Sequence, residues 1–220
     1  MKVLVIGGVA AGTKAAAKIK RQNRSAEVKI LTQSADISYA GCGLPYYVGG
    51  MIESREELIV NTPEKYTGLT GVEVVTRCEV TSVNFQAKTV TALCQGQTWL
   101  ESYDKLVIAT GATPFVPQVE GIRLSGVFTM RTPDDAIALR AYVQDRHCRS
   151  AVVVGAGFIG LEIAENLQAQ GLAVTVIDAA DQILPKIFDP EMAEYARRRL
   201  RQNGIRVLTG TPLSEITGTE

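Results

Sequence analysis

Residues 151–160 read Ala-Val-Val-Val-Gly-Ala-Gly-Phe-Ile-Gly, and this stretch decides the fold. The short apolar run predicts a buried parallel strand, and Gly155, Gly157 and Gly160 complete a G-x-G-x-x-G pattern. A helix to about residue 170 and a strand over 173–178 follow. The first glycine allows a tight turn, the second lets the backbone approach a pyrophosphate, and the third lets the helix pack on the strand. Phosphates would meet the free N–H groups of the helix N-terminus. The stretch therefore predicts a dinucleotide-binding unit.

An acidic residue completes this unit. Asp178 comes 23 residues after Gly155, at the end of the second strand, where a carboxylate can accept hydrogen bonds from a ribose 2′-hydroxyl. Ala179 and Ala180 follow, so no adjacent arginine is available for a 2′-phosphate. The unit is therefore expected to bind NADH rather than NADPH.

The same order of strand, glycine loop, helix and strand occurs within residues 3–31, and Gly7 precedes Gly155 by 148 positions. In this copy Val9 replaces the middle glycine, and Thr32 follows the second strand where an acid is expected. The residues alone leave two interpretations open, a second nucleotide site or a Rossmann-like layer without a ligand.

The chain between the two copies has a different composition. Four short segments rich in Val and Thr, at 72–76, 79–83, 89–93 and 99–101, predict a small antiparallel meander inserted into the first domain. A strand from Tyr103 then enters a turn of small residues, and two prolines mark an extended linker. We therefore expect an α/β protein with two Rossmann-like three-layer domains in tandem, over 1–112 and 113–220, the second incomplete at its C-terminus.

The overall composition excludes several classes of protein. The 220 residues are 46% hydrophobic, and 23 Lys and Arg balance 23 Asp and Glu. Zero net charge argues against a general nucleic-acid binder, which needs a basic surplus. No apolar run approaches the roughly 20 residues that span a bilayer. We expect a soluble, cytoplasmic protein without nucleic-acid or membrane partners.

The four cysteines, Cys42, Cys78, Cys94 and Cys148, lie 36, 16 and 54 positions apart. None of these spacings is typical of a metal site, and widely spaced cysteines in a reducing compartment are usually free thiols. We therefore expect neither a bound metal nor a structural disulfide. Cys42 differs from the others because it lies between Gly41 and Gly43, just beyond the first nucleotide unit. It is the candidate reactive thiol.

Together these motifs resemble a known family. The loop 7–12, the stretch 38–50 with its single cysteine, residues 109–112 and the second glycine loop are similar to the FAD-dependent pyridine nucleotide–disulfide oxidoreductases. Within them the chain resembles the single-cysteine branch of coenzyme A disulfide reductases, NADH oxidases, NADH peroxidases and persulfide reductases. The two-cysteine branch is disfavoured because Ile37 and Tyr47 stand where its second cysteine would be.

The resemblance assigns roles to individual residues. It places Cys42 beside the flavin as the redox sulfur. It implies that FAD is held by Gly7, Gly8, Ala11, Gly12, Thr32, Ser38, Val80, Thr110 and Gly111. It implies that NADH is held by Gly155, Gly157, Phe158, Ile159, Gly160, Glu162 and Asp178, and that Lys18, Arg21 and Ser38 lie in a coenzyme A site. From the residues alone, Glu162 and the basic stripe on the first helix could equally be solvated helix faces.

The family pattern is not matched at every position. Thr32 stands in place of a ribose-binding glutamate, Gly41 in place of an asparagine, and Phe158 in place of a tyrosine. The peroxidases have a histidine where this chain has Ala10, which disfavours peroxide as the acceptor. Family members are about twice this length and dimeric, so we expect a piece of a longer, homodimeric parent.

The implied reaction passes hydride from NADH through flavin to Cys42, and on to a coenzyme A disulfide or persulfide. Two alternatives stay open: an NADH oxidase that reduces oxygen, and a nucleotide-binding fragment without turnover.

Overall fold

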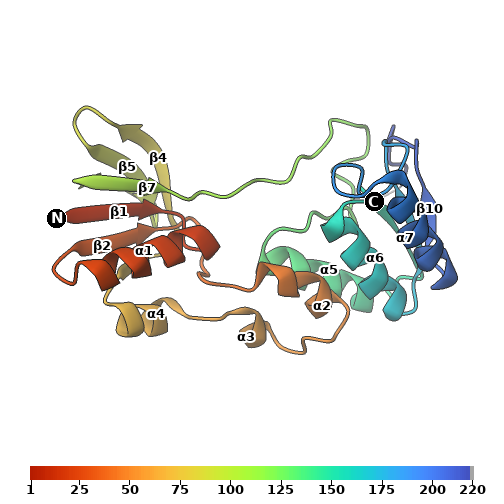
Figure 1. Ribbon diagram of the computed structural model, residues 1–220, viewed down its shortest axis with the longest axis horizontal. Helices are drawn as coiled ribbons and strands as arrows, with labels where there is room; N and C mark the ends of the chain where they lie inside the picture. Colours follow the sequence, from red (N-terminus) through yellow and green to blue (C-terminus); the bar gives the residue numbers. More distant parts are fainter. Residues whose placement is uncertain (219–220) are drawn as a thin grey trace. The chain divides into compact units, whose positions relative to one another are not determined.

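The computed structural model describes residues 1–218 (Figure 1). The chain folds into two compact units. The first unit comprises Met1–Ala40 and Ile59–Ala112, and the second comprises Gly41–Leu58 and the chain from Thr113 onward. The chain therefore passes between the units three times. Residues 41–58, which we expected within the first domain, pack in the second unit.

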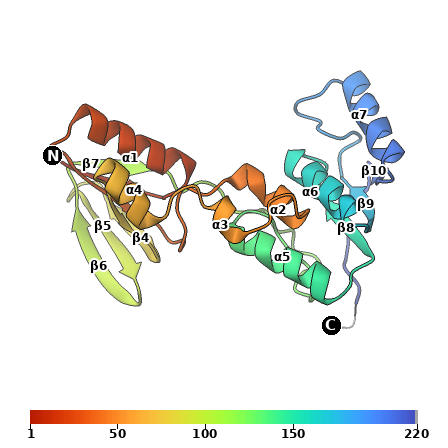
Figure 2. The ribbon, with the colours of Figure 1, turned by 90° about the horizontal axis from the view of Figure 1, so that it is seen from below.

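The first unit is built on a four-stranded parallel sheet in the order β3-β2-β1-β7. Its strands are β1 (Lys2–Ile6), β2 (Glu27–Leu31), β3 (Glu73–Val75) and β7 (Lys105–Ile108). Two helices, α1 (Ala10–Gln22) and α4 (Pro63–Thr70), cover one face (Figure 2). Ala16 and Tyr66 of these helices are buried against the sheet residues Val3, Val5 and Ile30, so this face holds one half of the core.

An antiparallel meander covers the other face of this sheet. It consists of β4 (Cys78–Asn84), β5 (Thr89–Cys94) and β6 (Gln97–Ser102). Val90 and Ala92 of β5 are buried with Leu4, Ile6 and Leu31 of the parallel sheet. The predicted three-layer α/β arrangement with a small antiparallel insertion is confirmed.

The predicted extent of the meander was wrong at its first segment. Residues 73–75 form β3, which pairs in parallel with Lys29–Leu31 of β2. The Thr32 amide also donates a hydrogen bond of 3.0 Å to the Val75 carbonyl. A segment of three residues is too short to show a periodicity. Which of the two sheets it joins therefore depends on tertiary pairing.

The expectation that no disulfide forms was also wrong. Cys78 and Cys94 are joined, and both are buried. They face each other in the register of β4 and β5, which brings their side chains to the same point of the ladder. Cys42 and Cys148 are free.

The second unit contains the parallel strands β8 (Ser150–Val154), β9 (Ala173–Ile177) and β10 (Arg206–Leu208), in the order β10-β9-β8. Its helices are α5 (Pro133–Asp145), α6 (Phe158–Ala169) and α7 (Pro190–Gln202). Residues 41–58 add a turn of 3-10 helix (Gly41–Gly43), α2 (Leu44–Val48) and α3 (Arg55–Leu58). Ile163, Ala164 and Leu167 of α6 are buried, as are Val174 and Val176 of β9.

The two parallel sheets differ in how their first strands are covered. In β1, Leu4 and Ile6 are buried beneath the meander. The corresponding residues of β8, Val152 and Val154, are 65% and 53% exposed. Across residues 1–218, none of the helices combines the length and the apolar character that a bilayer span demands.

Candidate nucleotide-binding loops and thiol

The first glycine loop has the geometry that a bound pyrophosphate needs. Gly7 has a φ of +105°, and its amide donates a hydrogen bond of 2.8 Å to the Leu31 carbonyl. A Cβ on Gly12 would overlap the Gly7 carbonyl oxygen, so only glycine lets α1 pack this close to the loop. No side chain caps the N-terminus of α1, which leaves its first N–H groups available for an anion.

The second loop repeats this geometry. Gly155 also has a φ of +105°, and its amide donates a hydrogen bond of 2.8 Å to the Ile177 carbonyl. A Cβ on Gly160 would overlap the Gly155 carbonyl oxygen. Gly157 is the N-cap of α6 without a side-chain cap, and no other group lies within 4 Å of where its Cβ would be. The backbone geometry therefore fits a dinucleotide at both loops, and open space beside the glycines is seen at Gly155 and Gly157 of the second.

Thr32 after β2 and Asp178 after β9 occupy equivalent positions but make different contacts. Asp178 accepts hydrogen bonds from the amides of Ala156 (2.6 Å) and Ala180 (2.8 Å), so its carboxylate is held at the second loop. Thr32 is 6% exposed and packs beneath Gly8, where a Cβ would lie 3.1 Å from the Thr32 Cγ2 atom. A carboxylate is thus presented only at the second loop.

Three more of the residues assigned to FAD lie at the first loop. Ser38 has a φ of +49°, and its amide donates a hydrogen bond of 2.9 Å to the Gly8 carbonyl. Thr110 and Gly111 follow β7, the strand beside β1, and a Cβ on Gly7 would overlap the Ala109 carbonyl oxygen. Val80 lies in β4, two residues after Cys78, whose amide donates a hydrogen bond of 2.9 Å to the Thr32 carbonyl, and Val80 packs on the core beneath the meander.

The remaining assigned residues lie on helices. Lys18 and Arg21 are exposed on α1, together with Lys14, and form a basic stripe. Phe158 and Ile159 begin α6 and are 53% and 56% exposed. Glu162 is half-buried one turn later, and its carbonyl accepts a hydrogen bond from the Asn166 side chain.

Cys42 lies in the second unit. It is exposed in the middle of the turn formed by Gly41–Gly43, and Leu44 begins α2 directly after it. Pro45 occupies the first turn of α2, as expected. Arg140, Asn166 and Gln170, which no sequence motif singled out, contact the segment after Cys42. Their partners are separated from them by more than 100 residues in two of the three cases, so no local pattern could have identified them.

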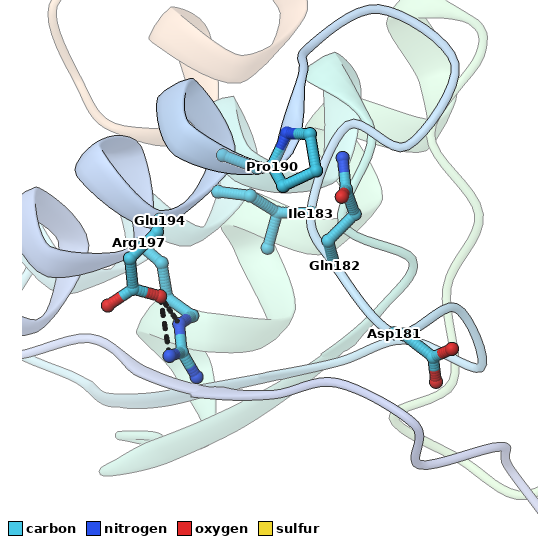
Figure 3. Close-up of a pocket in the computed structure, with 7 residues that line it drawn as sticks. Asp181, Gln182, Ile183, Pro190, Glu194 and Arg197 are labelled. Carbon is cyan, nitrogen blue, oxygen red and sulfur yellow. Dashed lines mark hydrogen bonds and ion pairs between the residues drawn. The ribbon is translucent and has the colours of Figure 1, made fainter.

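A cavity of about 220 Å³ lies between α7 and the loop that follows β9 (Figure 3). Asp181, Gln182 and Ile183 line it on the loop side, and Glu194 and Arg197 on the helix side. The Arg197 guanidinium lies 2.5 Å from Glu194 and lowers the pKa of that carboxyl by hydrogen bonding. None of the residues assigned to the nucleotides lines this cavity.

Comparison with known proteins gives relatives across the full chain. The NADH oxidase of Methanocaldococcus jannaschii is 39% identical over 223 residues, which cover 100% of this chain and 49% of that protein. The coenzyme A disulfide reductase of Staphylococcus haemolyticus is 34% identical and is covered over 43% of its length. The chain therefore spans about half the length of these relatives.

Solved structures agree with this match. The NAD-dependent persulfide reductase of A. fulgidus superposes with a TM-score of 0.95 and 38% identity, over 99% of this chain and 41% of that one. The water-forming NADH oxidase of Lactobacillus brevis, bound to NADH, gives a TM-score of 0.91 and 32% identity, over 100% and 48%. An engineered form of that oxidase is bound to NADPH.

The family model for pyridine nucleotide-disulphide oxidoreductases matches residues 1–220. With the paired glycine loops and the relatives in agreement, this chain belongs to the pyridine nucleotide-disulphide oxidoreductase family.

Proposed function

We propose that this chain is the nucleotide-binding half of an FAD-dependent oxidoreductase that uses NADH and the Cys42 thiol to reduce a coenzyme A disulfide or persulfide. The observation that carries the proposal is the presence of two uncapped glycine-loop helices and one exposed free thiol in a single chain of this family. Residues 1–112 would supply the FAD loop and residues 113–220 the NADH loop.

Each glycine loop has a defined task in this proposal. At the first loop, the N–H groups that begin α1 would hold the FAD pyrophosphate. At the second, the N–H groups that begin α6 would hold the NADH pyrophosphate, and Asp178 would accept hydrogen bonds from the ribose. When bound, FAD supplies the two-electron chemistry that links a hydride donor to a sulfur acceptor.

Cys42 supplies the sulfur chemistry. Its thiolate would attack the substrate disulfide, forming a Cys42–S–S–R bond, breaking the S–S bond of the substrate and releasing one thiolate, R–S⁻. Two electrons and one proton then cleave this bond, which releases R–SH and regenerates the Cys42 thiolate. The exposed turn between two glycines leaves the sulfur accessible to a bulky substrate. The basic stripe of Lys14, Lys18 and Arg21 would suit the phosphates of coenzyme A.

The preference for NADH rests on the residues around Asp178. The engineered oxidase that binds NADPH carries replacements of an aspartate, of the alanine after it, and of a proline seven positions beyond the aspartate. The same residue types stand in this chain at Asp178, Ala179 and Pro185, in the same spacing. The replaced glycine also has a counterpart, Gly160, whereas Ala180 stands where the replaced methionine was. This chain thus has four of the five residues that the engineered form lost, which supports NADH as the donor.

The test is an absorbance titration of the FAD-reconstituted chain with NADH under anaerobic conditions. We expect the flavin band to bleach with NADH, and a long-wavelength thiolate–flavin band to be lost in Cys42→Ser but retained in Cys148→Ser. Flavin that is retained but not bleached by NADH would overturn the proposal, and a chain that retains no flavin would be a nucleotide-binding fragment without turnover of its own. A band retained in Cys42→Ser would exclude Cys42 as the redox sulfur.

A second candidate function is reduction of oxygen, favoured by the NADH oxidases among the relatives. NADH consumption in air without any disulfide would support it. Consumption that needs a coenzyme A disulfide or persulfide would exclude it as the main activity.

A further inference from the structure

Cys42 lies in residues 41–58, an excursion in which the chain leaves the first unit and then returns to it. Its two ends meet in the first unit, where Tyr39 and Ile59 form an antiparallel bridge and the Val60 amide donates a hydrogen bond of 3.0 Å to Ser38. Residues 41–58 between these ends pack in the second unit, with α2 against α5 and α6 (Figure 2). The position of Cys42 is therefore decided by what fastens this excursion to α5 and α6.

Arg140, in the middle of α5, contacts three residues of this excursion. Its Nη1 atom donates hydrogen bonds of 3.1 Å to the carbonyls of both Ile52 and Glu53. The same guanidinium lies 4.6 Å from the centre of the Tyr47 ring. A planar guanidinium can donate in its plane while its face stacks on an aromatic ring, and lysine cannot do both. One side chain thus holds α2 and the bend after it.

The C-terminal half of α6 provides the second attachment. The Gln170 side chain donates a hydrogen bond to the carbonyl of Gly49, the C-cap of α2. Asn166 is 5% exposed, its amide nitrogen donates to the Glu162 carbonyl, and its side chain fills the place where a Cβ of Gly49 would be. Gly49 is therefore required for α2 to approach α6 this closely.

We propose that Arg140 and Gln170 are positioning residues for Cys42, and that they fix the thiol to the unit that carries the second glycine loop. Helix α6 begins in that loop at Phe158 and reaches the excursion through its last turns. The thiol thus shares a packed body with the second loop, although in sequence it follows the first. A catalytic role for the positioned thiol rests on the function proposed above.

The test uses a nitroxide label on Cys42 in a Cys148→Ser chain, where Cys42 is the sole free thiol because Cys78 and Cys94 are paired. In Arg140→Ala we expect the label to tumble at least twofold faster than in the parent chain. Arg140→Lys should give an intermediate spectrum, because lysine keeps the charge but cannot both bridge two carbonyls and stack. Arg198→Ala on α7, which removes an exposed arginine of the same unit, should leave the spectrum unchanged.

Identical spectra for Arg140→Ala and the parent chain would overturn the proposal, as would an equal change in Arg198→Ala. If Arg140→Ala fails to fold, Gln170→Ala removes one hydrogen bond from an exposed side chain and should produce the same change in smaller degree. In the FAD-reconstituted chain, Arg140→Ala should lower kcat several-fold without changing KM for NADH. A parent chain that never oxidises NADH would defeat the proposed function but leave the label result intact.

Discussion

The glycines of this chain differ in whether their position has room for a side chain. Gly12, at the start of α1, has no room for a Cβ because the Gly7 carbonyl lies against it. Gly68, within α4, has open space around the same position. We expect Gly12→Ala to lower the free energy of unfolding by more than about 2 kcal/mol, since backbone must move. Gly68→Ala should raise it by roughly 0.5–1 kcal/mol. Urea unfolding followed by circular dichroism measures both, and equal effects would contradict the assignment.

Glu101 gives a prediction about pH. Burial acts to raise its pKa, but the hydrogen bond and charge of Lys2 and the charge of Lys29 together hold it below the usual value. Because the folded pKa is lowered, the stabilisation is present at neutral pH and is lost as pH falls through the folded pKa. Glu101→Gln should cost on the order of 1 kcal/mol at pH 7.

This cost should shrink as pH drops below about 4.3, the ordinary glutamate value, and vanish below the folded pKa. Urea midpoints of the variant and parent chain at pH 7, 4 and 3 measure the trend. Glu27→Gln, at an exposed position of β2, is the control and should show no such trend. A cost independent of pH would contradict the ion-pair explanation.

The residues most accurately predicted from sequence are those whose requirement is local. A glycine loop needs a positive φ at Gly7 and Gly155 and no Cβ at Gly12 and Gly160, and these needs can be read directly from the spacing. Cys78 and Cys94 were misjudged because their pairing depends on the register of two strands. That register follows from packing on the sheet and not from the cysteine spacing.

At the scale of elements, the link between β4 and β5 is a covalent one. Non-reduced, denatured chain should release two thiols per molecule in a thiol titration, from Cys42 and Cys148. Reduction should raise the count to four and lower the stability of the first unit by about 3 kcal/mol, the loop-closure value for a link of this length. Cys94→Ser is the control, because it should be insensitive to reductant. Four thiols before reduction would contradict the link.

The first strands of the two parallel sheets, β1 and β8, offer a matched pair of substitutions. Leu4 of β1 is fully buried beneath the meander, whereas Val152 at the equivalent position of β8 is 65% exposed. Leu4→Ala should therefore cost about 2–5 kcal/mol, through lost burial and the cavity left behind. Val152→Ala should change stability by no more than about 0.5 kcal/mol. Urea unfolding of the two variants decides the matter, and a comparable loss in both would show that β8 is covered.

Elements were predictable where they carry their own signal. In each nucleotide unit the first strand, the glycine-loop helix and the second strand follow from apolar runs and glycines, and the fold class follows from their order. No motif singled out α4, α5 or α7. The short β3 carries no such signal, so its partner could not be predicted. The attachment of residues 41–58 through Arg140 depends on contacts 87 and 88 positions apart, which no periodicity records.

At the scale of the whole molecule, the extended linker after Ala112 provides a test of the excursion. Phe115 is 92% exposed, and chymotrypsin should cleave after it. The N-terminal fragment then still carries residues 41–58, which pack against α5 and α6 of the other fragment. We expect the two fragments to co-elute in gel filtration after cleavage, and to separate more readily when Arg140→Ala is present. Complete separation of the unsubstituted fragments would contradict this packing.

The matching glycine loops show which positions the backbone of such a loop constrains. Across residues 3–12 and 151–160, only three positions are identical, Val5 with Val153, Gly7 with Gly155 and Gly12 with Gly160. The two glycine pairs are those whose backbone geometry favours glycine over every other residue. The remaining positions differ between the loops while the backbone stays alike, so the side chains there are free to suit a different nucleotide at each loop.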